Sequence, residues 1–315
     1  MKASILIPAF NAATYLNETL QSCVEQGLQY VEEIIIVDDG SEDNTLQVAN
    51  AFAQSHPEVK CIIESNRKRG ACAARNHAFL LSSARAIQWL DADDILGLGK
   101  LKRQLAILHA NPDCLIASKW CRFEGDLNNL WPEEKGKWSA TPKTSTPEEW
   151  LCADRMMIPA GWLGTKKLFE SIGPWDESLN INQDGEYFTR AIAASKGVLF
   201  EGKSRVYYRS SLQNSVSKFS PEKATSLFTT AESFEATVKT LGQSPALNTA
   251  ISNKYQQFIY RVYPHVPELR KKAENKVRKF GTPTTPLDLA ESKFAKLFCW
   301  FFGWKLLVQL RRLRK

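Results

Sequence analysis

Three aspartates within four positions are the residues of this sequence best suited to bind a metal ion. Asp91, Asp93 and Asp94 directly follow an apolar segment, AIQWL, at residues 86–90. Carboxylates at the tip of a strand suit Mg²⁺ or Mn²⁺ shared with a diphosphate, because such ions use one or two carboxylates plus substrate phosphates. The alternative is a helix N-cap, which Asp94 would satisfy alone. That alternative leaves the other two acids unexplained.

Three further apolar segments also end in polar residues. They are followed by PAFN at residues 8–11, DDGS at 38–41 and NRKRGACAARN at 66–76. In an open parallel sheet, ligands bind outside the carboxyl ends of the strands, so four polar ends predict a functional crevice. Asp38 and Asp39 also fit an ordinary turn. The functional alternative is a carboxylate that accepts a hydrogen bond from a nucleotide base.

The elements that must position these residues follow from the hydrophobic periodicity. Short apolar runs predict buried strands, and the segments between them have apolar residues at helical spacing. This alternation predicts an α/β fold with a doubly wound, mostly parallel sheet flanked by helices. The expected strands are residues 3–7, 33–37, 59–63, 86–90 and 114–118, and the expected helices are 13–26, 44–54, 71–83 and 99–110.

The periodicity weakens after these elements. Gly, Pro, Ser, Thr and Trp accumulate over residues 120–150, which predicts a long loop-rich insert. Thr146, Pro147 and Glu149 then have the pattern of an N-cap, a first-turn proline and a capping box, so a helix is expected to begin there. The remaining expected elements are helices at 166–171 and 185–195, strands at 198–201 and 205–209, a mainly helical stretch at 221–280 and a linker at 281–286.

The first turn argues against two common nucleotide-binding classes. A dinucleotide fold needs GxGxxG after its first strand, and this chain has PAFNAA there. A Walker loop is also missing, so neither NAD nor P-loop chemistry is favoured. A sugar-1-phosphate nucleotidyltransferase needs a Gly-rich, basic loop at the same place, which PAFN does not provide.

The positive charge is concentrated at one end of the chain. The sequence has 41 Lys and Arg against 34 Asp and Glu, a net charge of +7. Residues 292–315 contain seven of the basic residues and no acid, so the remaining chain is balanced at 34 against 34. A balanced body gives no support for nucleic acid as a partner.

The basic segment itself has the pattern of an amphipathic helix. Aromatic residues with Lys and Arg at both ends suit a helix that lies in an anionic membrane interface; the alternative is a helix packed on the catalytic domain or in a dimer. Lys305 falls on the apolar stripe and is expected to snorkel or to form a pair. The other residues of the stripe are Phe294, Leu297, Phe298, Phe301, Trp304 and Val308.

Other features favour a cytoplasmic protein. The apolar run before Pro8 is shorter than the roughly 7–15 residues of a signal-peptide core. No apolar stretch reaches the roughly 18 residues of a spanning helix. Seven cysteines are scattered without a CxxC pair, which is typical of a reducing compartment.

Seven segments together resemble the inverting family 2 glycosyltransferases, which have the GT-A fold. They occur in the family's order and cover roughly residues 2–218. The segments are ILIPAFNAATYLNETLQSCVEQ, EIIIVDDGSEDNT, NRKRGACAARNHAF, WLDADD, LFESIGPWDESL, QDGEYFTRA and YYRSSLQNSVS.

The resemblance implies a role for particular residues of this chain. Asp39 would accept a hydrogen bond from the base, commonly uracil, and Asn66 and Arg75 would lie near the nucleotide or its phosphates. Asp91 and Asp93 form the DxD pair: Asp93 is the preferred metal ligand, and Asp91, which can also bind the metal, would face the ribose or the donor sugar. The remaining donor-binding residues would be Pro8, Ala9, Phe10, Asn11 and Ala92.

The catalytic base implied by the resemblance is Asp184. By residue type alone, it would be a solvated acid in the first turn of a helix. Gln183 replaces the Glu that usually precedes the base, and Phe10 stands where Tyr is frequent. Neither change removes an essential charge.

Two further positions have open alternatives. Arg209, with Ser215 and Ser217, would form a mobile lid over the diphosphate or a plain polar loop. Trp162 or a neighbouring tryptophan would contact the acceptor, although large aromatics are more often simply buried.

These observations predict a hexosyltransferase that depends on Mn²⁺ or Mg²⁺ and inverts the anomeric centre. It would transfer a sugar from a UDP-sugar to a hydroxyl of a glycan or lipid-linked acceptor in bacterial surface polysaccharide or lipopolysaccharide synthesis, at the inner face of the cytoplasmic membrane. The alternatives are a non-catalytic, membrane-associated nucleotide-sugar-binding protein and the nucleotidyltransferase. The expected organisation is a catalytic domain at 1–220, with a nucleotide-sugar half at 1–118 and an acceptor half at 119–220, then a helical extension at 221–291 and the basic tail at 292–315.

Overall fold

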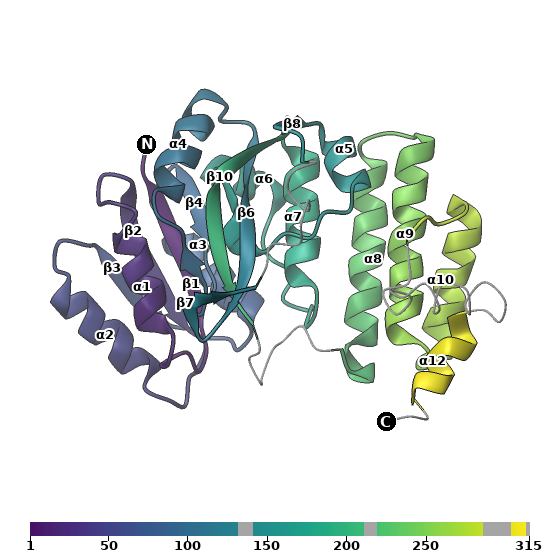
Figure 1. Ribbon diagram of the computed structural model, residues 1–315, viewed down its shortest axis with the longest axis horizontal. Coiled ribbons are helices and arrows are strands. Elements are labelled where there is room, and N and C mark those ends of the chain that lie inside the picture. Colours follow the sequence, from purple (N-terminus) through teal and green to yellow (C-terminus); the bar gives the residue numbers. More distant parts are fainter. Residues whose placement is uncertain (132–140, 211–218, 286–303, 313–315) are drawn as a thin grey trace. The chain divides into compact units, whose positions relative to one another are not determined.

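The computed structural model describes residues 1–131, 141–210, 219–285 and 304–312 (Figure 1). The chain divides into two compact units, Met1–Val216 and Ser217–Lys315. The first unit contains the sheet and all the predicted site residues. The second unit is helical throughout its described part.

The first unit is built on a mixed, mostly parallel sheet. The strand order is β3-β2-β1-β4-β9-β6-β10-β5, with β7 paired to β6 and β8 paired to β10. The central strands are continuous apolar runs, which is typical of strands buried on both faces. The strand bounds are β1 Ala3–Ala9, β2 Val31–Asp38, β3 Cys61–Ser65, β4 Ala86–Trp89, β5 Ile95–Leu96, β6 Leu115–Glu124, β7 Asp126–Leu130, β8 Thr144–Ser145, β9 Trp162–Thr165 and β10 Val198–Arg209.

The strand order places the crevice between β1 and β4. The chain moves outward from β1 to β2 to β3 and then returns to β4 on the other side of β1, with β1 parallel to both of its neighbours. Right-handed crossovers therefore put α1 (Leu16–Val24) and α2 (Thr45–Ser55) on one face and α3 (Ala71–Leu81) on the other. Ligands bind where the strand order reverses in this way.

An aromatic core joins the sheet to helix α7 (Gln183–Ala194), whose first turn contains Asp184. Trp89 of β4 contacts Phe169, Trp175 and Tyr187 at ring-centroid distances of 5.9, 5.2 and 5.6 Å. These rings come from α6 (Lys166–Ile172), the turn that follows it, and α7. The core therefore fixes the start of α7 against the end of β4. Two further helices complete the unit, α4 (Lys100–Ala110) and α5 (Pro147–Cys152), with a 3₁₀ turn at Pro159–Gly161.

The prediction of a loop-rich insert at residues 120–150 is wrong for residues 120–130. Strand β6 continues to Glu124 and β7 follows at once, because Trp120, Cys121 and Phe123 are buried on a pleated strand that pairs with β10. Residues 132–140 lie outside the described residues. The two strands expected at 198–201 and 205–209 are parts of one strand, β10, with a register shift between them. The expected capping box at Thr146 is confirmed.

The second unit packs three long helices and a short one. Helix α8 (Ala224–Lys239) contains Glu235, which accepts hydrogen bonds from Tyr255 at 2.6 Å and from Lys276 at 2.7 Å. Those partners lie on α9 (Pro245–Val262) and α10 (Pro267–Phe280), so one buried carboxylate links all three helices. The pKa of Glu235 is lowered to about 2, because these hydrogen bonds and the one from Lys239 outweigh the effect of burial, which raises it.

The last described helix, α12 (Trp304–Arg312), packs on this unit. The Trp304 ring lies 4.9 Å from that of Tyr260 and 5.0 Å from that of Tyr263. Lys305 forms the expected pair, with Glu274 at 3.5 Å. Most of the apolar stripe predicted at 294–310 lies outside the described residues.

At the amino-terminal edge of the sheet, away from the crevice, Glu33 provides a test of the fold. Its fully buried carboxylate accepts hydrogen bonds from Ser4 at 2.7 Å, Lys60 at 2.6 Å and the Ser83 backbone at 2.6 Å. Burial raises the pKa of Glu33, but these hydrogen bonds outweigh it and lower the pKa from 4.5 to about 2. A carboxyl group with a depressed pKa stabilises the fold above its unfolded pKa and loses that contribution as the pH falls through its folded pKa.

We expect Glu33→Gln to lower the free energy of unfolding by about 1–3 kcal/mol at pH 7, because it removes a charged partner from several buried donors. Urea unfolding between pH 7 and about pH 2 measures this. The difference from wild type should shrink below about pH 4.5, where unfolded Glu33 is protonated. Glu32→Gln is the matched control, since its carboxylate is 44% exposed. A constant difference across this range contradicts the assignment.

Candidate active site

The loops that follow β1 and β2 are joined by hydrogen bonds. The Asn11 backbone N–H donates to the Ser41 hydroxyl at 2.9 Å, and the Asn11 side-chain oxygen accepts from the Glu42 N–H at 2.8 Å. Asn11 has a φ of +48°, a left-handed conformation that Asn tolerates better than most residues. This conformation lets one residue hold both ends of the second loop. Asn11 therefore holds the loops after β1 and β2 together.

The paired acids after β2 have different roles. Asp38 is 2% exposed and accepts hydrogen bonds from the backbone N–H groups of Gly40 and Ser41, both at 3.1 Å. Asp38 therefore builds the turn. The Asp39 backbone N–H donates to the Ala9 carbonyl at 2.7 Å. The turn interpretation of this sequence therefore describes Asp38, and base binding by Asp39 stays a prediction.

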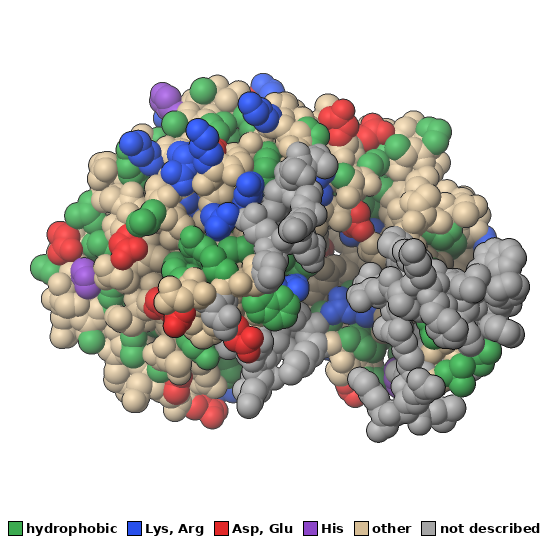
Figure 2. All heavy atoms as spheres, viewed as in Figure 1, with side chains coloured by type: hydrophobic (Ala, Val, Ile, Leu, Met, Phe, Trp, Pro, Cys, Tyr) green, Lys and Arg blue, Asp and Glu red, His purple; other side chains and the backbone are tan. Residues whose placement is uncertain are grey.

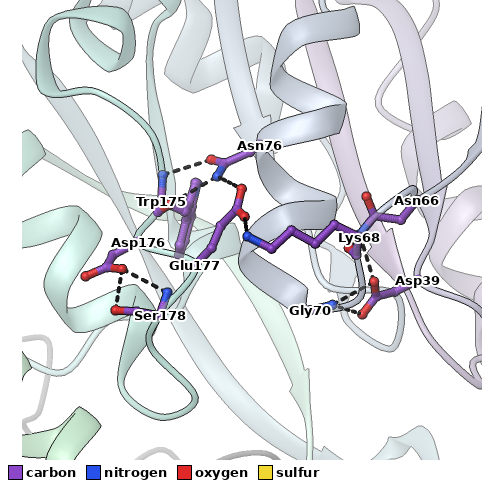
Figure 3. Close-up of polar contacts among 9 residues, drawn as sticks. All are labelled: Asp39, Asn66, Lys68, Gly70, Asn76, Trp175, Asp176, Glu177 and Ser178. Carbon is purple, nitrogen blue, oxygen red and sulfur yellow. Dashed lines mark hydrogen bonds and ion pairs between the residues drawn. The ribbon is translucent and has the colours of Figure 1, made fainter.

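Asp39 anchors the loop that follows β3 (Figure 3). Its carboxylate accepts from the Asn66 side-chain amide at 2.7 Å and from the Gly70 N–H, 2.9 Å from each carboxylate oxygen. Gly70 has a φ of +132°, a conformation that side chains rarely adopt, and it precedes the first residue of α3. The structure brings Asp39 and Asn66 together, as expected for one pocket. Phe10 lies at the end of β1 with its ring 53% exposed and available for stacking.

A second connection runs from this loop to the segment before α7 (Figure 3). Lys68 forms an ion pair with Glu177. Asn76 accepts from the Trp175 N–H at 2.8 Å and donates to the Trp175 carbonyl and to the Glu177 carboxylate, both at 3.0 Å. One side-chain amide therefore fixes the backbone of Trp175, whose ring stacks on Tyr187 at 4.0 Å.

Arg75 occupies the centre of the crevice. Its guanidinium donates to the Asp91 carboxylate at 2.7 Å and to the Gln183 side-chain oxygen at 3.3 Å, and it lies 4.6 Å from the Trp175 ring centroid. The residue is 8% exposed. Arg75 thus connects the end of β4 to the start of α7. Its predicted position beside the nucleotide phosphates stays a prediction.

Asp184 lies in the first turn of α7, beside Arg75 and Asp91. Burial raises the pKa of Asp184, the Gly185 N–H and the Arg75 charge lower it, and the charge of Asp91 adds to the increase; the net direction is upward. A carboxylate with a raised pKa is a stronger base. This environment suits proton abstraction better than the solvated-acid alternative does.

The Gln183 side chain explains one departure from the family pattern. Its amide N–H donates to the Leu179 carbonyl at 2.7 Å while its oxygen accepts from Arg75. A glutamate could not donate to that carbonyl. Gln183 therefore stabilises the turn before α7 and leaves Arg75 directed toward Asp91.

The acids after β4, Asp91, Asp93 and Asp94, lie close together, and few hydrogen-bond donors contact their carboxylates. Asp94 is fully buried, accepts one hydrogen bond from the Arg209 N–H at 3.1 Å, and has a second oxygen without a partner among the described residues. Burial, and then the charge of Asp91, raise the pKa of Asp93 to about 6. Bringing these carboxylates together is unfavourable without a cation, and their hard oxygens fit a divalent one.

Within the described ranges, no group of three or more His, Cys, Asp or Glu side chains is arranged to hold a metal by itself. Asp91 and Asp93 would therefore share such an ion with phosphate oxygens. Ala92 between them is 7% exposed, and its carbonyl accepts from the Thr19 hydroxyl at 3.0 Å.

Arg209 is fixed rather than mobile. It is 3% exposed, lies between the Tyr15 and Phe123 rings at 4.5 and 4.3 Å, donates to the Asp93 carbonyl at 3.0 Å and pairs with Glu18. The expectation that Arg209 belongs to a mobile lid is therefore corrected. Arg209 instead supports residues 91–94, which we call the acidic loop, through the Asp93 carbonyl and the Asp94 carboxylate. Ser215 and Ser217 lie outside the described residues. No sequence pattern pointed to Glu18, because its partner is far away along the chain.

The expectation that Trp162 contacts the acceptor is also corrected. It is 1% exposed, and its ring lies 5.5 Å from those of both Trp150 and Phe188. Its faces are already covered by neighbouring rings, so the predicted acceptor contact is replaced by packing. The buried-aromatic alternative describes this residue.

The fold and this crevice define a GT-A type glycosyltransferase. A family model described as glycosyl transferase family 2 matches residues 4–173, just over half of the chain, and this protein belongs to that family. The S. aureus TarS 1–349 structure in complex with UDP matches with a TM-score of 0.64 at 16% identity, covering 89% of each chain. At that identity the likeness shows the fold alone.

Similar sequences are also glycosyltransferases. An uncharacterized glycosyltransferase of Haemophilus influenzae is 34% identical over 40% of this chain and 51% of its own length. A poly(ribitol-phosphate) beta-glucosyltransferase of Bacillus spizizenii is 35% identical over 54% of this chain and 25% of its own length. This chain thus spans about half or less of these relatives.

We expect Asn76→Ala to lower the free energy of unfolding by about 1–3 kcal/mol, since it leaves the Trp175 N–H and carbonyl without their partner. Turnover should also fall, because Trp175 supports Arg75 and α7. Lys68→Ala is the comparison: its ion pair with Glu177 is largely exposed, so removing it should cost less than about 1 kcal/mol. Urea unfolding measures both variants. An equal or smaller loss for Asn76→Ala contradicts its positioning role.

Proposed function

We propose that this protein is a metal-dependent, inverting hexosyltransferase that uses a UDP-sugar. The observation that carries the proposal is that Arg75 binds the Asp91 carboxylate and lies within electrostatic range of Asp184, while Asp39 holds the loop that leads into the helix of Arg75. A base-binding carboxylate, a metal-binding carboxylate and a catalytic base are the acidic groups that such a transfer requires.

The donor assignment is supported by the Asp39 pocket. The carboxylate already orders the loop through Gly70 and Asn66, and carboxylate oxygens have lone pairs left for an N–H of the base. A structure with the same fold, S. aureus TarS 1–349, is described in complex with UDP-GlcNAc; it matches with a TM-score of 0.62 at 16% identity, covering 89% of each chain. Uracil is the base that we propose here.

The mechanism assigns the proton to Asp184. A sugar hydroxyl is a poor nucleophile, and the Asp184 carboxylate accepts its proton as the new glycosidic bond forms and the bond to the diphosphate breaks. One displacement inverts the anomeric carbon, so one base suffices. The charge of Arg75 lowers the pKa of Asp184 and so favours its ionised form against the effect of burial.

Asp91 and Asp93 would hold the cation. Such an ion, when bound, neutralises the charge that develops on the departing diphosphate. Arg209 and Thr19 hold the backbone of the acidic loop at the Asp93 and Ala92 carbonyls, which presents both carboxylates to the crevice. Mn²⁺ and Mg²⁺ both fit these oxygen ligands.

The acceptor that we propose is a hydroxyl of a surface glycan or of a lipid-linked glycan. Work at the inner face of the cytoplasmic membrane is part of this proposal. No helix in the described part of the chain has the length and apolarity to cross a bilayer. Helix α10 exposes Lys271, Lys272, Arg278 and Lys279 on one side, and α12 exposes Leu306 (38%) and Leu310 (43%). Exposed leucines on one helix and exposed basic residues on the other suit an anionic lipid surface.

Asp184→Asn tests the catalytic part of the proposal. We expect UDP binding to require Mn²⁺ or Mg²⁺ and to be the same in wild type and variant, while transfer falls by about 10²–10⁴-fold because the base is lost. Calorimetry and a coupled assay of UDP release measure the two effects. Asp176→Asn, just before α7, is the matched control and should retain activity. UDP binding without any metal effect, or full turnover in Asp184→Asn, contradicts the proposal.

Liposome flotation tests the membrane part. We expect the full chain to associate with vesicles containing phosphatidylglycerol, and to lose most of that association at high salt because exposed charges are screened. Removing residues 292–315 should weaken binding, and adding Lys271→Gln and Lys272→Gln should remove it. If these changes leave flotation intact, neither helix is the attachment site.

A further inference from the structure

A cluster of one arginine and three aromatic rings lies beside the acidic loop and is not used by the mechanism. Arg122 of β6 lies 5.7 Å from the Trp120 ring and 5.8 Å from the Trp131 ring, and Trp120 lies 5.9 Å from Tyr208. The Trp131 N–H donates to the Arg122 carbonyl at 2.9 Å. We call these four residues the Arg122 cluster.

The Arg122 cluster adjoins the reaction centre. Tyr208 is the register partner of Arg122 and precedes Arg209, the residue that holds Asp93 and Asp94. Burial raises the pKa of Tyr208 to about 12, and so do the charges of Asp94, Asp91 and Asp93, while Arg122 lowers it. The phenol therefore lies within electrostatic range of both the acids and the arginine.

Among the described residues, the Arg122 cluster has an exposed aromatic ring and a charge without a counter-ion. Trp131 is 44% exposed, unlike the buried Trp120. Within the described residues, the Arg122 guanidinium forms no ion pair and no hydrogen bond, and its contacts are the two indole rings. Because neither ring accepts a hydrogen bond from it among the described residues, the half-buried guanidinium keeps N–H donors for a ligand. Figure 2 shows hydrophobic side chains exposed around the position of β7, with both acidic and basic side chains near them.

Resting on the proposed function, we propose that the Arg122 cluster is the acceptor subsite and that the acceptor carries an acidic group. The Trp131 ring would stack on the C–H face of a sugar, and the Arg122 fork would bind a phosphate or carboxylate of the acceptor through two parallel hydrogen bonds. Anchored in this way, the reacting hydroxyl lies toward the acidic loop. The subsite thus selects charged glycans over neutral ones.

Matched oligosaccharides test this with the full chain. The carboxylate probe is tetragalacturonate against its uncharged methyl ester, and the phosphate probe is maltotetraose 6-phosphate against maltotetraose. The readout is the Trp131 indole N–H signal in ¹⁵N NMR, assigned with Trp131→Phe. We expect at least one acidic probe to shift this signal and to bind about tenfold or more tightly than its uncharged partner, a difference of about 1.4 kcal/mol.

Variants then assign the charge recognition. Arg122→Gln should abolish the preference for the acidic probe, and Arg122→Lys should restore only part of it, because Lys lacks the fork. Lys119→Ala is the matched control: it lies three residues earlier on β6, on the opposite face, and should behave as wild type. Equal binding of charged and uncharged probes, or an unmoved Trp131 signal with both acidic probes, overturns the subsite.

UDP binding separates this inference from the proposed function. Arg122→Gln should bind UDP and metal as wild type does, since Arg122 is not in the donor crevice. If wild type fails to bind UDP with either metal, the proposed function fails whatever the Trp131 signal does. If UDP binds normally and the acidic probes have no advantage, only the subsite fails.

Discussion

The rest of the site depends on the burial of one guanidinium among carboxylates. Arg75 has almost no exposed surface, and its partners come from the end of β4 and the start of α7. Burying an arginine is costly unless its charge is paired, so the positions of Asp91 and Gln183 at its two terminal nitrogens are constrained in turn. Asn76 fixes Trp175 beneath it, and Gln183 orients it toward Asp91. Arg75 therefore couples the end of β4 to the start of α7, in addition to the connection through Asn76 and Lys68.

The acidic loop presents the opposite problem. Asp91, Asp93 and Asp94 repel one another, yet the fold holds them in place through Thr19, Arg209 and strand β4, which ends at Trp89. Stability elsewhere allows this, since carboxylates such as Glu33 and Glu235 are fully partnered. Electrostatic strain at a functional loop is a common way to prepare a site for a cation and an anionic substrate.

Local sequence patterns predicted the main strands and helices of the sheet unit and the acids at the strand tips. They could do so because buried parallel strands and helix caps leave strong local signals. They failed where the answer depends on distant partners. The extension of β6 past Trp120 rests on pairing with β10, Arg209 is fixed by Glu18, and Trp162 is covered by Phe188. The sequence also could not tell that Asp38 holds its own turn while Asp39 holds the next loop, because the partner of Asp39, Gly70, is distant along the chain.

The central claim is that one carboxylate, Asp184, acts as the sole base in a single displacement. The most direct test is the configuration of the product sugar when the enzyme cleaves an α-linked UDP-[1-¹³C]sugar in the presence of Mn²⁺. Rapid ¹³C NMR distinguishes the two anomers before they interconvert in solution. We predict that the β anomer forms first. Initial formation of the α anomer would mean two displacements and a second nucleophile, and would contradict this account.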